Sequence, residues 1–136
     1  YWLHFFGLLG KAFLIITTTA TNGSEYVNRY LNKIFSCLGA CRLCVETFSY
    51  IDTIETAENK LKKVVDHVGK YMAGEIEYQI KGIQNQLFIE YKKIFSLYPE
   101  TNHEYQYWLK HGFFQCKTLQ EAYEYSILSG SLSSPS

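Results

Sequence analysis

The chain has 136 residues, with 13 basic and 13 acidic side chains, so its formal net charge is zero. That length is normally one domain with a single core. Proteins that follow the phosphates of a nucleic acid need a basic stripe, and the balanced charge argues against that class. Charged residues make up 19% of the chain and aromatic residues 17%, which predicts a folded chain with much of its surface against something other than water.

Residues 1–21, YWLHFFGLLGKAFLIITTTAT, are the most apolar segment. A helix that is apolar on almost all sides lies in a protein core or in a membrane. About 19 residues span roughly 28 Å as a helix, just enough to cross the hydrocarbon layer, although Lys11 near the middle costs about 2.5–3.5 kcal/mol there. We expect a hydrophobic helix that is a possible membrane anchor. A buried core helix and a cleaved secretory leader are the alternatives.

The next segment carries an unbroken apolar series in alternating steps of three and four residues. Its members are Val27, Tyr30, Ile34, Cys37, Cys41, Cys44, Phe48 and Ile51. This spacing predicts one long helix whose face meets a partner helix, as in a coiled-coil seam. Ser24, after Asn22-Gly23, is a suitable N-cap for it. Similar series predict a second long helix over 54–71 and a third over 76–97, which Pro99 ends.

Two capping patterns predict short helices near the carboxyl terminus. Asn102 can cap the first, and Thr118 with Glu121 forms a capping box for the second. Residues 129–136, SGSLSSPS, have the composition of a flexible tail.

The predicted fold is therefore all-α: an antiparallel helical bundle of three long helices, with a hydrophobic N-terminal helix and two short C-terminal helices. Residues 1–21 form the N-terminal helix, residues 22–128 the bundle domain and residues 129–136 the tail.

The cysteines are the residues with the most potential chemistry, and Cys116 is the fourth candidate beside Cys37, Cys41 and Cys44. Thiolates bind zinc and iron–sulfur clusters. However, the first three fall on seam positions that the flanking apolar residues define independently, and there Cys behaves as a small hydrophobe. We therefore expect core packing, with no metal and no cofactor.

The sequence holds no Ser/His/Asp order with a supporting motif and no Gly-rich phosphate loop, so we expect no enzymatic activity. We expect a non-catalytic structural or interaction subunit of a larger, membrane-associated assembly. Its partners would be other protein subunits and, through residues 1–21, membrane lipid. Aromatic side chains are the interface candidates: Phe5, Phe6, Phe13, Tyr105, Trp108, Phe113 and Phe114.

Two other functions stay open at this point. The first is a secreted helical binding protein for an apolar ligand, with residues 1–21 as its leader. The second is a small iron–sulfur or zinc protein that uses the cysteines.

Overall fold

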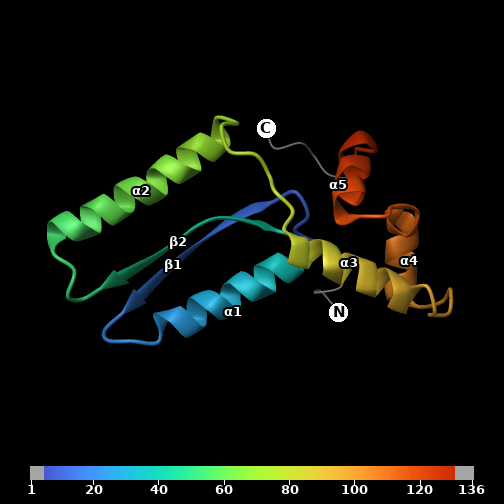
Figure 1. Ribbon diagram of the computed structural model, residues 1–136, viewed down its shortest axis with the longest axis horizontal. Helices are drawn as coiled ribbons and strands as arrows, with labels where there is room; N and C mark the ends of the chain where they lie inside the picture. Colours follow the sequence, from blue (N-terminus) through green and yellow to red (C-terminus); the bar gives the residue numbers. More distant parts are fainter. Residues whose placement is uncertain (1–4, 131–136) are drawn as a thin grey trace.

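A computed structural model describes residues 5–130 and combines helices with a parallel sheet (Figure 1). The elements follow in the order β1 (Ala12–Thr19), α1 (Ser24–Cys37), β2 (Cys41–Ser49), α2 (Ile54–Met72), α3 (Gly82–Phe95), α4 (His103–Lys110), a short 3₁₀ helix (Phe113–Gln115) and α5 (Leu119–Leu128). β1 and β2 run parallel and α1 connects them, which makes a βαβ unit. Helices α3 to α5 gather at one end of the molecule, beyond the amino ends of the strands (Figure 1).

The all-α prediction is wrong, and the N-terminal segment is the first reason. Residues 12–19 form a strand instead of a helix. This stretch ends in the run Ile15–Thr19, and β-branched side chains lose rotamer freedom in a helix but fit a strand. A continuous apolar run does not by itself distinguish a buried strand from a buried helix. Within residues 5–130 no helix is long and apolar enough to cross a membrane; residues 1–4 of the predicted helix lie outside the described part.

The long seam helix is also wrong, because the segment divides into α1 and β2. Helix α1 ends at Cys37, and Gly39 follows with a φ of +90°. A side chain at this glycine would be strained by that backbone angle, and its Cβ would lie 3.2 Å from the Cα of Leu9. From Cys41 the side chains alternate between the two faces of the sheet, so the steps of three and four there do not describe a helix.

The other helices were predicted more closely. Helix α2 begins after Thr53, whose hydroxyl accepts a hydrogen bond from the Thr56 amide. The predicted caps of α4 and α5 are confirmed: Asn102 accepts from two amides of α4, and Thr118 accepts from the amide of Glu121. Helix α3 begins only at Gly82.

The segment before α3 explains the late start of that helix. Ile76, Tyr78 and Ile80 are half-buried and alternate with exposed residues, which is the pattern of an extended chain. Ile76 and Ile80 are also four residues apart, a spacing that fits one face of a helix. For this reason the predicted helix began at Ile76, within the extended segment.

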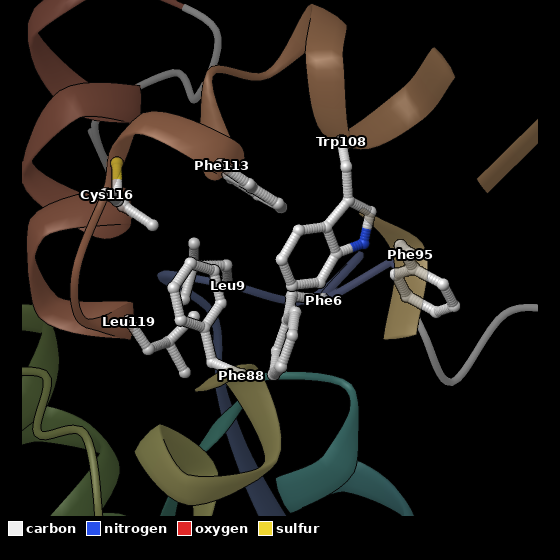
Figure 2. Close-up of a cluster of buried hydrophobic side chains, with 9 residues drawn as sticks. Phe6, Leu9, Phe88, Phe95, Trp108, Phe113, Cys116 and Leu119 are labelled. Atoms are coloured by element: carbon white, nitrogen blue, oxygen red, sulfur yellow. The ribbon is translucent and has the colours of Figure 1, made fainter. Parts of the chain in front are cut away.

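The main core is an aromatic cluster that α3, α4 and α5 build around the N-terminal turn (Figure 2). Trp108 is fully buried, with its ring centroid 5.0 Å from that of Phe88, 5.3 Å from that of Phe95 and 5.4 Å from that of Phe113. The cluster consists of Phe6, Leu9, Phe88, Phe95, Trp108, Phe113, Cys116, Leu119 and Ala122. The aromatic cluster lies beyond the amino ends of the strands, and most of β1 and β2 does not contact it.

Candidate functional site

Helix α1 covers one face of the sheet. Phe13 of β1 stacks on Phe35 of α1 with ring centroids 4.9 Å apart. Farther along, the hydroxyls of Thr17 and Thr47 are 3.0 Å apart, and the Asn28 amide of α1 donates to Thr47 over 3.0 Å. These contacts place Thr17 of β1 and Thr47 of β2 on the α1 face of the sheet.

Helix α2 covers the other face, where it packs on β2. Lys60 donates to the Thr47 carbonyl over 2.7 Å and lies 5.9 Å from the centre of the Phe48 ring, while Lys63 pairs with Glu46 at 3.2 Å. Because side chains alternate along a strand, Glu46 and Phe48 face α2.

The matching row of β1 has no such cover. Leu14, Ile16 and Thr18 pair in register with Cys44, Glu46 and Phe48, so they share the α2 face. Ile16 is 48% exposed in the middle of its strand, whereas Ile15 on the opposite face is 3% exposed. All-parallel sheets normally have both faces covered, so this half-covered face is the least complete part of the described structure.

The two strands differ in the residues that they carry. β2 contains Arg42 and Glu46, and charged residues are typical of strands at the edge of a sheet. β1 contains no charged residue and reads as a continuous apolar and β-branched run, which is typical of an interior strand of a parallel sheet. Within residues 5–130, however, β1 pairs with β2 alone.

Helix α2 carries an exposed apolar line of its own. Its members follow one another in steps of seven, four and seven residues, which places them on one line of the helix. They are Ile54, Leu61, Val65 and Met72, with exposed fractions of 82%, 53%, 62% and 80%. The candidate functional site is the outer edge of β1 together with the row Leu14, Ile16 and Thr18, in which Ile16 and Thr18 are exposed and Leu14 is half-buried. We call it the open sheet edge.

The carboxyl ends of β1 and β2 form a second candidate site, because open α/β sheets bind ligands outside these ends. Two adjoining hollows lie there. One, of about 390 Å³, is lined by Thr18, Thr19, Ala20, Phe48, Ser49 and Tyr50. The other, of about 320 Å³, is lined by Thr17, Thr18, Thr19, Asn22, Gly23, Ser24 and Val27. Most lining side chains are hydroxyl-bearing, small or aromatic, Asn22 adds an amide and Val27 an aliphatic group, and none of these residues is charged. The buried Oδ1 atom of Asn28, on the same helix as Val27, has no hydrogen-bond partner.

The cysteines predicted as low-probability metal ligands are placed on three different elements. Cys37 ends α1, Cys41 and Cys44 belong to β2, and Cys116 precedes α5. All four are free thiols, and burial raises the pKa of Cys44 and Cys116. Among residues 5–130 no group of three or more His, Cys, Asp or Glu residues could hold a metal ion.

The predicted interface aromatics lie within the chain's own packing. Phe6, Trp108 and Phe113 are buried in the aromatic cluster. The other four are half-buried against aromatic neighbours: Phe5 on Tyr107, Phe13 on Phe35, and Tyr105 and Phe114 on each other. Sequence reasoning missed the open sheet edge. The β-branched run of residues 15–19 could have indicated a strand there, but not that the strand has a free edge.

Comparison of the chain with protein-family models and with curated protein sequences found no match. The functional reading therefore rests on the geometry described above.

Proposed function

We propose that the chain is a non-catalytic interaction subunit that supplies two strands to a larger parallel α/β sheet. The observation that carries this proposal is the outer edge of β1. This strand has the residues of an interior strand, but within residues 5–130 it pairs on one side only. An unpaired strand edge presents backbone N–H and C=O groups to an incoming strand, and strand addition is a recurrent mode of protein recognition.

The partner that fits is an α/β unit whose own edge strand runs parallel to β1. Purely parallel sheets are over-represented relative to chance, which favours a parallel strand over an antiparallel one. The partner would also cover Ile16 and the exposed part of Leu14. The balanced net charge gives no long-range repulsion against such a partner. That the assembly is attached to a membrane stays a prediction. The N-terminal helix on which it was based is replaced by a strand over residues 12–19.

The substitution Ile16→Lys tests this proposal. It places a charge on the exposed face of β1. Ile94→Lys on α3 is the matched control, because Ile94 is 46% exposed against 48% for Ile16 and lies outside both candidate sites. We expect the wild-type chain and the control to be recovered in an assembly larger than the 15.8 kDa chain. We expect Ile16→Lys to be recovered as a folded monomer.

Hydrogen exchange identifies the surface that the assembly covers. The β1 amides that do not bond β2 should exchange rapidly in the isolated chain and slowly in the assembly. The proposal is refuted by a stable wild-type monomer in which these amides are already protected, or by an assembly that Ile16→Lys leaves intact.

A second candidate function is the binding of a small molecule at the carboxyl ends of the strands. The two adjoining hollows support it, and their uncharged lining with Phe48 and Tyr50 suits a planar, uncharged heterocycle. Riboflavin is a suitable probe, because its ring is planar and fluorescent. Quenching that saturates, and that Tyr50→Ala weakens while Tyr26→Ala does not, would support this function. Quenching that is linear in protein concentration would exclude it.

A further inference from the structure

A cavity near the amino ends of β1 and β2 has no role in either proposed function. It measures about 510 Å³ and lies between the end of α2, the extended segment that follows and the start of α5. Small-molecule sites are typically about 300–1,000 Å³. The cavity is lined by Tyr71, Met72, Gly74, Ile76, Glu77, Tyr78, Gln120 and Tyr123.

Three tyrosines from three different segments meet at this cavity. The rings of Tyr78 and Tyr123 have centroids 4.5 Å apart and are tilted by 39°. The Tyr78 hydroxyl donates a hydrogen bond to the carbonyl of Gly39, which fixes the Tyr78 ring beside the amino ends of the strands. Burial raises the pKa of Tyr78. Tyr71 lines the same cavity from the end of α2.

The charge of the lining has one sign. Among the lining residues in the described part of the chain, Glu77 is the only charged one and is exposed to solvent, and none is Lys or Arg. The Gln120 amide is already used, since it donates to Glu124 over 2.9 Å. Met72 and Ile76 supply apolar surface beside the tyrosines.

An aromatic and apolar lining with one carboxylate favours a ligand that carries a positive charge and apolar groups. The electron-rich faces of aromatic rings attract organic cations, and groups of aromatic rings bind quaternary ammonium ions in this way. A carboxylate at the mouth attracts the same cations and repels anions. We propose that this cavity is a binding site for a quaternary or alkylated ammonium group, which Tyr71, Tyr78 and Tyr123 contact and Glu77 attracts.

Choline and its neutral isostere dimethylbutanol test the proposal on the unmodified chain, since the two differ in charge and hardly in shape. Isothermal titration calorimetry should give saturable binding of choline and at least about tenfold weaker binding of dimethylbutanol. Equal affinities for the two compounds, or no binding of choline at millimolar concentration, would overturn the proposal.

Two pairs of variants locate the site. Glu77→Gln should weaken choline binding about threefold to tenfold, whereas Glu75→Gln, at an exposed carboxylate outside the lining, should not change it. Tyr123→Leu should weaken binding about tenfold, and Tyr26→Leu at an exposed ring on α1 should not. If Tyr123→Leu does not fold, the two carboxylate variants decide. Equal effects of Glu77→Gln and Glu75→Gln would place choline elsewhere and refute this site.

Discussion

Gln84 joins the βαβ unit to the helical end of the molecule, and replacing it tests how the two are held together. Its side chain is 1% exposed in the first turn of α3. The amide nitrogen donates to the carbonyls of Ser36 and Ala40, each over 3.0 Å, and the amide oxygen accepts from the Lys81 backbone over 2.9 Å. One side chain therefore connects α3 to the turn between α1 and β2.

Gln84→Met keeps the length of the side chain and removes all three hydrogen bonds. A buried polar group that loses its partner costs about 1–3 kcal/mol. The Ser36 carbonyl keeps a second bond, from the amide of Gly39, so its loss is at the low end of that range. The greater hydrophobicity of Met offsets about 1 kcal/mol. We expect the free energy of unfolding to fall by about 2–6 kcal/mol.

Urea denaturation followed by circular dichroism measures this change from the midpoint and the slope. Gln86→Met, on the exposed side of the same helix, is the control and should change the free energy of unfolding by about 0.5 kcal/mol or less. Gln84→Glu adds a sharper test, because a carboxylate there would face two carbonyl oxygens and be most destabilising at neutral pH. A loss below about 0.5 kcal/mol for Gln84→Met would refute this account of the connection.

Two further predictions concern the aromatic cluster and the end of β2. Trp108→Ala should lower the free energy of unfolding by about 3–5 kcal/mol, measured by urea denaturation, because it empties the centre of the cluster; a loss under about 1 kcal/mol would contradict this. A hydrogen bond from Lys60, with another from the Ser49 amide, lowers the pKa of Asp52 below 3.8. Its stabilising contribution is therefore present above about pH 4 and is lost as pH falls through the lowered pKa. Asp52→Asn should lower the thermal midpoint at pH 7 and leave it nearly unchanged at pH 2; equal losses at both pH values would contradict the assignment.

Elements set by neighbouring residues could be predicted from the sequence. The Asn102 and Thr118 caps depend on amides two or three residues away, so their sequence patterns suffice. Helix α2 was also predicted, since its amphipathic spacing is continuous over 54–71. The predicted interface residues instead pack within the chain. An aromatic-rich sequence indicates that rings are packed, but not whether a ring lies inside the chain or at an interface. Phe6 and Trp108 lie inside.

The sequence by itself determined the extent of α2, the Asn102 and Thr118 caps and the two short helices after them, all of which depend on contacts within a few residues. Only the tertiary structure decided that residues 12–19 and 41–49 are strands. Their hydrogen bonds join segments about 30 positions apart, as Thr17 and Thr47 show. An apolar run is equally compatible with a buried helix and with a strand of a parallel sheet, and pairing with a second strand decides between them. The same physical reason hid the open sheet edge, because an edge is defined by the pairing that a strand lacks.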